Sequence, residues 1–121
     1  MFELSIHRDF AAAHNLRGYA GNCERLHGHN WKVEIVIRSE ALDSLGMVMD
    51  FREAKKAADA VLEEFDHHYL NELARFQKRN PTTENIASVI FSEVAQKLPR
   101  GVSLAKVTVW ESEGCSATYS E

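Results

Sequence analysis

Residues 27–38 read HGHNWKVEIVIR, and from Trp31 onward an apolar side chain stands at every second position. Alternation with a period of two is typical of a β-strand that buries one face, so a strand is predicted over 29–38. In an extended chain, His27 and His29 also point to the same side, and Gly28 leaves room between them. This stretch therefore predicts both a central strand and a pair of imidazoles at its start.

A second alternating stretch begins the chain. Its apolar positions are Phe2, Leu4, Ile6 and Phe10. They predict a first strand over about 2–10. The connection over 11–26 is long for a hairpin, and it carries His14 and Cys23. Long loops inside compact domains are usually functional or disordered, so we expect this one to belong to a functional site.

Two amphipathic segments follow the central strand. Asp50 can cap a helix that continues over about 51–65 with an apolar stripe on one side. The segment PTTE at 81–84 predicts the start of a second helix, which Pro99 and Gly101 end. Both segments are therefore expected to pack one face against the sheet.

Two more strands are expected, over 103–111 and around 116–119. The order ββααββ predicts an α+β fold in which two helices cover one face of a four-stranded antiparallel sheet. The length of 121 residues indicates one domain over 1–121. Open sheet edges are usually covered by association, so an oligomer is expected.

The overall charge argues against several classes of partner. The formal net charge is −4, and the isoelectric point is about 5.9. Such a chain has no basic field to attract nucleic acid or an anionic membrane. It also shows no signal peptide and no apolar run of membrane-spanning length, so we expect a cytoplasmic protein. In that compartment Cys23 and Cys115 are expected to be free thiols.

His14, His27 and His29 are the candidate metal ligands. Three histidines with an open fourth position are the ligand set of catalytic zinc. Two alternatives remain open. Cys23 could be a fourth ligand of a structural zinc ion, or the HGH pair could be polar strand surface.

Cys23 is the candidate general base. A thiolate near a divalent cation has a lowered pKa and can accept a proton near neutrality. Cys115 is expected to be a small buried residue instead. The structural-zinc alternative would make Cys23 a ligand rather than a base.

Three further residues carry chemistry. Asp66 and His67 suggest a proton relay, although His67 could equally favour a helix C-terminus through its dipole. Glu111 is expected on the core face of its strand, where a carboxylate could accept two parallel N–H bonds from a ligand. Its alternative is a solvated position at the rim of the sheet.

Together these residues resemble the 6-pyruvoyl-tetrahydropterin synthase family over nearly the whole chain. The resemblance is carried by Cys23-x-x-x-His27-Gly-His29, the preceding Ala-Ala-His14, the run from Asp66 to Asn71, Asn80-Pro81-Thr82-Thr83-Glu84, and Glu111. The three-residue gap between Cys23 and His27 is similar to the bacterial branch that makes 6-carboxy-5,6,7,8-tetrahydropterin for queuosine biosynthesis. The pyruvoyl-forming animal enzymes have a longer gap.

The resemblance implies a tunnelling fold and a homohexamer built from two trimers. It implies zinc as the metal on His14, His27 and His29, with Cys23 as proton acceptor. The remaining roles that it implies are a relay for Asp66 and His67, a pterin grip and part in the relay for Glu111, and a place near the pterin pocket for Thr82, Thr83 and Glu84.

The implied reaction converts 7,8-dihydroneopterin triphosphate to 6-carboxy-5,6,7,8-tetrahydropterin, with release of triphosphate and acetaldehyde. A carbon–oxygen and carbon–carbon lyase of this kind needs no redox cofactor. Arg8, Arg25 and Lys32 are candidates for the triphosphate site, or else solvated charges. Other activities remain open: a pyruvoyl-type synthase, an aldolase acting on the dihydroneopterin side chain, or a zinc-binding module without activity.

Overall fold

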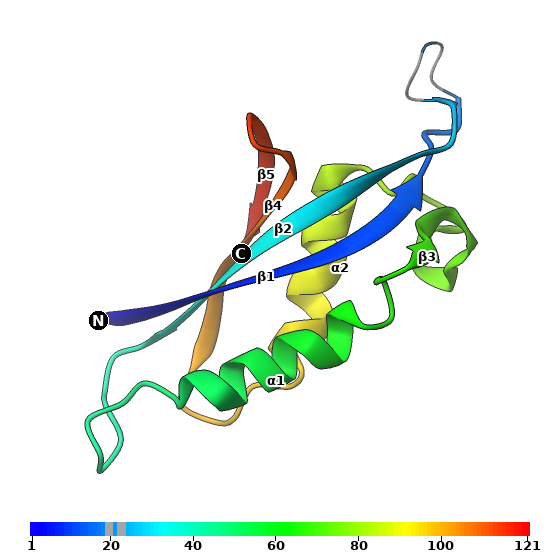
Figure 1. Ribbon diagram of the computed structural model, residues 1–121. Helices are drawn as coiled ribbons and strands as arrows, with labels where there is room; N and C mark the ends of the chain where they lie inside the picture. The colour runs from blue at the N-terminus through cyan, green and yellow to red at the C-terminus, as the bar shows by residue number, and fades with distance from the viewer. Residues whose placement is uncertain (19–20, 22–23) are drawn as a thin grey trace.

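The structure is a computed structural model that describes residues 1–18, 21 and 24–121. Five strands form one sheet in the order β3-β1-β2-β4-β5, and two helices cover one of its faces (Figure 1). The elements are β1 (Phe2–His14), β2 (His27–Ser39), α1 (Phe51–Leu62), β3 (His68–Tyr69), η2 (Leu70–Glu72), η3 (Ala74–Phe76), α2 (Thr83–Ala95), β4 (Ser103–Ser112) and β5 (Cys115–Ser120). The predicted α+β fold is confirmed. The two-residue strand β3 is an addition to the four expected strands, and its parallel pairing with β1 makes the sheet mixed.

The long antiparallel pair of β1 and β2 dominates the sheet. Its register runs without interruption from Phe2 opposite Ser39 to His14 opposite His27. β1 thus continues four residues beyond Phe10, through a segment that the sequence assigned to a loop. The reason for the difference is the run of three alanines over 11–13, which gives little strand signal of its own. Pairing with β2 on one side and β3 on the other extends the strand nevertheless.

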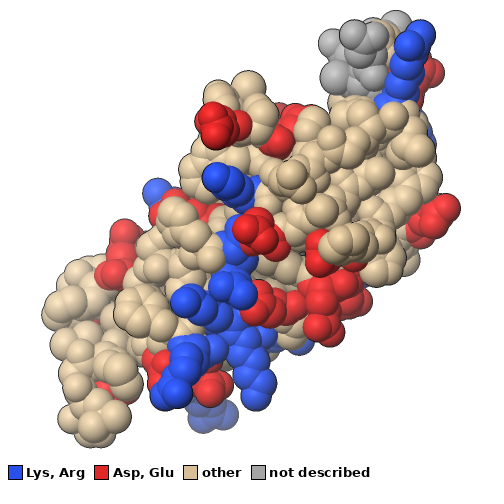
Figure 2. All heavy atoms as spheres, in the orientation of Figure 1, with Lys and Arg blue, Asp and Glu red and all other residues tan. Residues whose placement is uncertain are grey.

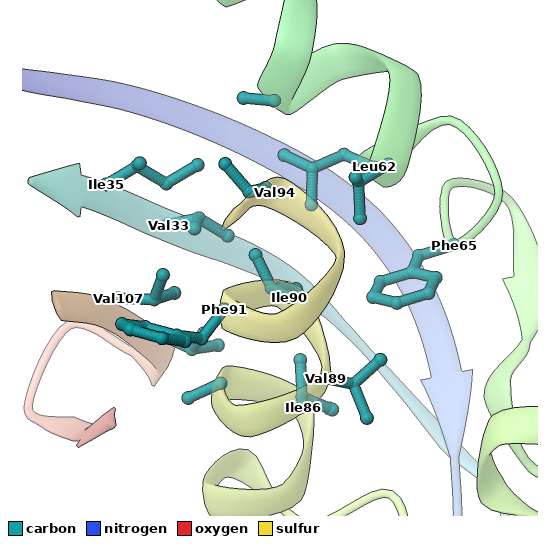
Figure 3. Packing of buried hydrophobic residues seen from close by; sticks show 14 of the residues in the cluster. Val33, Ile35, Leu62, Phe65, Ile86, Val89, Ile90, Phe91, Val94 and Val107 are labelled. Carbon is teal, nitrogen blue, oxygen red and sulfur yellow. The ribbon is translucent and has the colours of Figure 1, made fainter. Parts of the chain in front are cut away.

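The core lies between the sheet and the helices. Figure 3 shows side chains of β2 and β4 interdigitating with those of α2, while Leu62 and Phe65 close the core from the side of α1. Trp31, Val33, Ile35 and Ile37 of β2 are all at most 1% exposed. The face predicted by the alternation is therefore the buried one.

Each helix begins at the expected cap. The Asp50 carboxylate accepts a hydrogen bond from the backbone N–H of Arg52, and the Thr82 hydroxyl accepts one from that of Asn85. α1 ends at Leu62, earlier than expected, and Phe65 is buried beyond the helix end. Phe51, expected in the apolar stripe, is 55% exposed because it lies in the first turn, at the edge of the covered face.

Charged side chains of both signs share the face over α1. Figure 2 shows Lys and Arg gathered there, with Asp and Glu beside them. The Arg8 guanidinium donates two hydrogen bonds, of 2.8 and 2.7 Å, to the Asp59 carboxylate. This pair ties β1 to α1. In the part of the chain that the structure describes, neither helix has the length and apolarity needed to cross a bilayer.

Candidate metal centre

The strand register brings the three predicted ligand histidines together. His14 is paired with His27 across β1 and β2, and Ala12 is paired with His29. Residues two apart on a strand share a face, so all three imidazoles point to the side that the helices cover. Their ring centroids lie 4.5 Å apart for His14 and His27, 5.2 Å for His14 and His29, and 4.8 Å for His27 and His29.

Backbone carbonyls fix how two of these rings are presented. Nδ1 of His14 donates to the Pro81 carbonyl at 2.8 Å, and Nδ1 of His27 donates to the Arg25 carbonyl at 2.7 Å. Because a carbonyl only accepts, the neutral form of each ring carries its proton on Nδ1. The lone pair of Nε2 is then free to bind a metal, and second-shell bonds of this kind orient histidine ligands in metal sites.

Glu111 completes the cluster from β4. Its Oε1 lies 2.8 Å from Nε2 of His29, 3.5 Å from that of His14 and 3.9 Å from that of His27. Glu111 stands where the pairing of β4 with β5 shifts register. The side chain faces the helix side of the sheet, as predicted, and is 32% exposed rather than fully solvated.

The donor set fits a metal ion. Nε2 of His14 and Nε2 of His29 are buried, and neither has a hydrogen-bond partner among the described residues, since the close contact of His29 with Glu111 lacks hydrogen-bond geometry. One ligand atom from each of the four side chains lies within 4.8 Å of all the others. A tetrahedral zinc ion holds its ligands about 3.4 Å apart, so small side-chain rotations would close this shell. Imidazole suits zinc among several transition metals.

Burial keeps His14 in the form that binds metal. It lowers the pKa of the His14 imidazole, because the charged ring loses its hydration; His27 and His29 act in the same direction. The Pro81 carbonyl and the Glu111 carboxylate oppose this shift without reversing it. His14 is therefore neutral at pH 7 and can donate its Nε2 lone pair.

A pocket of about 310 Å³ opens beside the cluster. It is lined by His14, Leu16, His27, Thr82, Thr83, Glu84 and Glu111. The hydroxyl of Thr83 donates to the second carboxylate oxygen of Glu111 at 3.4 Å. The structure therefore brings the predicted substrate residues of the α2 entry to the same pocket as two of the histidines. The ends of β1, β2 and α2 that form it lie at one end of the sheet (Figure 1).

Asp66 and His67 lie together, although their adjacency in sequence did not require it. Nδ1 of His67 is 3.0 Å from the Asp66 carboxylate, whose other oxygen accepts the Ala11 N–H at 2.9 Å. The N–H of His67 in turn donates to the Ala11 carbonyl at 2.6 Å. α1 ends at Leu62, so His67 is beyond the reach of the helix terminus and the dipole explanation loses its basis.

This Asp66–His67 pair does not line the histidine pocket. His67 is 82% exposed and borders a separate hollow over β3, β1 and β2, with Ala11, Ala13, Gly28 and Asn30. Within a single chain the structure therefore places the predicted relay beside β1, apart from the pocket that holds Glu111.

The two cysteines differ in what the structure describes. Cys23 lies outside the described residues, so its predicted role stays a prediction from the sequence. Cys115 is exposed, and the expectation of a buried residue is wrong. The reason is its place at the turn between β4 and β5, where the helices no longer cover the sheet.

Two of the three triphosphate candidates, Arg8 and Lys32, lie away from the cluster, whereas the backbone carbonyl of Arg25 contacts His27. Lys32 borders a hollow of about 710 Å³ on the other face of the sheet, together with His7, Trp110 and Glu113. Arg8 also borders this hollow, but its guanidinium is directed to Asp59 of α1 on the covered face. Arg8 is already held by Asp59, which raises the pKa of its guanidinium and makes it a structural residue first.

Sequence reasoning missed the residues that support the cluster. Pro81 was assigned only to a helix start, yet its carbonyl orients His14. Asn71 and Asn80 also contact the segment that follows His14. Their only signal in the sequence was membership of the motifs that carry the family resemblance.

Comparison with known proteins identifies relatives over almost the full length. The family model for 6-pyruvoyl tetrahydropterin synthase matches residues 3–121. A protein of Archaeoglobus fulgidus, provisionally assigned as 6-carboxy-5,6,7,8-tetrahydropterin synthase, is 42% identical over 110 residues, which are 91% of this chain and 88% of that protein. The dihydroneopterin monophosphate aldolase of Pyrococcus furiosus is 40% identical over 102 residues, 84% of this chain and 82% of the aldolase.

A solved structure agrees with this assignment. The 6-pyruvoyl tetrahydropterin synthase of Caenorhabditis elegans superposes with a TM-score of 0.87 at 29% identity, covering 100% of this chain and 97% of that one. The likeness confirms the tunnelling fold that the sequence resemblance implied.

Proposed function

The chain belongs to the 6-pyruvoyl tetrahydropterin synthase family, and from this premise we propose that it is a zinc-dependent lyase acting on a pterin side chain. The proposed reaction converts 7,8-dihydroneopterin triphosphate and one water molecule to 6-carboxy-5,6,7,8-tetrahydropterin, triphosphate and acetaldehyde. Its place would be the cytoplasmic synthesis of 7-deazaguanine nucleosides such as queuosine. The three-residue gap between Cys23 and His27 favours this product over the pyruvoyl one.

One observation carries the proposal. The imidazoles of His14, His27 and His29 converge with the Glu111 carboxylate at the mouth of a pocket of about 310 Å³. A cluster of three imidazoles can hold zinc and leave a position for a ligand. A bound zinc ion would supply Lewis acidity to a side-chain oxygen of the substrate.

The other roles fall to residues around that pocket. Glu111 lies between the histidines and Thr83, so its carboxylate can accept two N–H bonds from a pterin ring in the pocket. Thr82 and Glu84 border the same space. We assign Cys23 as the base that takes a proton from the substrate, on the strength of its place four residues before His27.

Asp66 and His67 are assigned to carry that proton away. Their distance from the pocket in one chain leads us to propose that the active site is completed between subunits of a homohexamer, built as two trimers. The exposed His67 imidazole and the hollow on the uncovered sheet face support such an arrangement. A neighbouring copy could then present Asp66 and His67 to Cys23.

A second candidate function has its own support. The Pyrococcus furiosus relative is named dihydroneopterin monophosphate aldolase and is 40% identical. An aldolase would use the same metal site but cleave the side chain without loss of triphosphate. Histidine geometry does not separate the two reactions, whereas their products differ.

The test is product analysis on purified protein loaded with zinc. Incubation with 7,8-dihydroneopterin triphosphate should yield 6-carboxytetrahydropterin, triphosphate and acetaldehyde by mass spectrometry. A parallel incubation with dihydroneopterin monophosphate tests the aldolase. Turnover of neither substrate by protein that holds zinc would overturn both and leave a zinc-binding module.

A further inference from the structure

Two asparagine side chains hold the backbone that follows His14. Oδ1 of Asn71 accepts the N–H of Asn15 at 3.0 Å, and Nδ2 of Asn71 donates to the carbonyl of the same residue at 2.9 Å. Asn80 repeats the arrangement two residues later. Its Oδ1 accepts the N–H of Arg17 at 2.9 Å, and its Nδ2 donates to the Arg17 carbonyl at 2.9 Å.

These hydrogen bonds take the place of a paired strand along the segment that follows β1. β3 pairs with β1 only at Ala12 and Ala13. Beyond that point Asn15 and Arg17 would present unpaired backbone groups, and each is satisfied by one side-chain amide that donates and accepts as a neighbouring strand does. His14 stands between the last β3 pair and the first amide clamp, so its backbone is fixed on both sides.

Asn80 also controls the partner of the His14 ring. It directly precedes Pro81, whose carbonyl accepts the His14 Nδ1–H, and its own carbonyl accepts a hydrogen bond of 2.8 Å from the Asn85 side chain. The Pro81 peptide is therefore anchored through Asn80 to Arg17, in the segment that follows β1, and through Asn85 to α2. Proline itself contributes no N–H that could do this.

We propose that Asn71 and Asn80 are positioning residues of the metal site, which fix the backbone and the tautomer of His14 before a metal binds. His14 is 2% exposed and its Nε2 is buried. Because the site is closed to solvent, a misoriented ring could not form compensating hydrogen bonds with water. The inference rests on the proposed zinc function, because it concerns the affinity of that site for zinc.

The Asn80→Ala variant tests the inference directly. It removes both bonds to Arg17 and so one of the two anchors of the Pro81 peptide, while the Asn85 bond to the backbone carbonyl of residue 80 stays. Zinc affinity should fall about 10- to 100-fold, the usual effect of losing a second-shell partner. Asn71→Ala should weaken zinc in the same direction. The measurement is competition for zinc ions against a chromophoric chelator, with the melting temperature of the metal-free protein recorded alongside.

Ser39→Ala is the matched control. The Ser39 hydroxyl lies within hydrogen-bond distance of the carbonyls of Ala41, at 2.7 Å, and Gly101, at 3.0 Å, and its single proton can be donated to either. This makes it a side-chain clamp on the backbone at the opposite end of β2. Its loss should lower the melting temperature and leave zinc affinity unchanged. If Asn80→Ala and Ser39→Ala behave alike in both measurements, Asn80 is merely structural and the inference is wrong.

A spectroscopic measurement on the unaltered protein keeps the inference testable even if the asparagine variants fold poorly. Long-range ¹⁵N–¹H spectra of metal-free protein should show His14 protonated on Nδ1 alone, whereas a mixture of tautomers would overturn the proposal. Failure of the unaltered protein to bind zinc would instead refute the proposed function. Unchanged zinc affinity in both asparagine variants would refute only the inference.

Discussion

His14 and His27 are cross-strand partners at the last register position of the β1–β2 pair, with ring centroids 4.5 Å apart. Two ligand positions thus sit on paired strands rather than on the loop that joins them. Strands hold such side chains more rigidly than loops do. The metal site is consequently a product of the hairpin register, and a slip by one residue would send His14 and His27 to opposite faces.

The first prediction concerns metal content. The protein should hold about one zinc ion per chain, and His27→Ala should lose most of it because only two of the three proposed imidazole ligands remain, the Glu111 carboxylate being assigned to the pterin ring. Zinc per chain after dialysis is the measurement. His7→Ala is the control, because His7 lies on β1 with its side chain 72% exposed and contacts Glu34 rather than the cluster. Full zinc in His27→Ala would contradict the site.

The second prediction separates the two possible roles of Glu111. If the carboxylate grips the pterin ring, Glu111→Gln should keep zinc but weaken pterin binding about 10- to 100-fold, since one acceptor of a charged hydrogen-bond pair becomes a donor. Calorimetry measures the affinity for a pterin ligand, and a metal assay measures the zinc content. Loss of zinc together with unchanged pterin affinity would make Glu111 a metal ligand instead.

Glu113→Gln provides the comparison for that experiment. Glu113 is exposed at the turn after β4 and borders the hollow on the opposite face. Its neutralisation changes the net charge equally, so neither zinc nor pterin binding should respond.

The fold was predictable where periodicity was strong. The buried face of β2, with Trp31 at its centre, followed from alternation alone, and Asp50 and Thr82 cap the helices as their residue types suggest. β3 was not predictable, because two residues carry no period and its pairing with β1 depends on the turn at His67.

The site was predictable in composition but not in arrangement. Spacing grouped His27 with His29, whereas His14 was expected on a loop and in fact ends β1. The contact of Glu111 with His29 depends on the tertiary placement of β4 at that end of the sheet, and no local pattern encodes it. The same holds for Pro81, which reaches His14 across 67 positions of sequence.

Acid stability should depend on Asp66. The hydrogen bond from the Ala11 N–H holds the pKa of the Asp66 carboxyl below its usual value; desolvation opposes this effect, and His67 and His68 add to the lowering. A carboxyl whose pKa is lower in the folded state stabilises the fold above its unfolded pKa, about 4, and this contribution is lost as the pH falls through the folded pKa. Asp66→Asn cannot titrate, so its free energy of unfolding should fall less than that of the unaltered protein between pH 5 and 2, roughly the range in which carboxyls titrate. Urea unfolding across that range is the measurement, and parallel pH profiles would contradict the prediction.

Backbone strain at His67 should be measurable. Its φ of 59° lies in the left-handed region, which costs a residue with a Cβ about 1–2 kcal/mol. His67→Gly and His67→Ala both remove the imidazole, but only glycine relieves the strain. His67→Gly should therefore be the more stable of the two by about 1 kcal/mol in chemical denaturation. Equal stability, or a more stable alanine variant, would show that the turn is unstrained.

Cys23 decides between catalytic and structural zinc. If three histidines hold the metal and Cys23 is the base, Cys23→Ala should retain zinc and pterin binding yet lose turnover by about 100- to 10,000-fold, the usual contribution of a positioned base. Cys115→Ala is the matched control, since it removes the exposed thiol at the β4–β5 turn and should leave turnover unchanged. If Cys23 is a fourth ligand, the same variant should instead lose metal and melt at a lower temperature, because a structural zinc ion stabilises the fold directly. Zinc content, melting temperature and acetaldehyde release, measured on one preparation of each variant, distinguish the two outcomes.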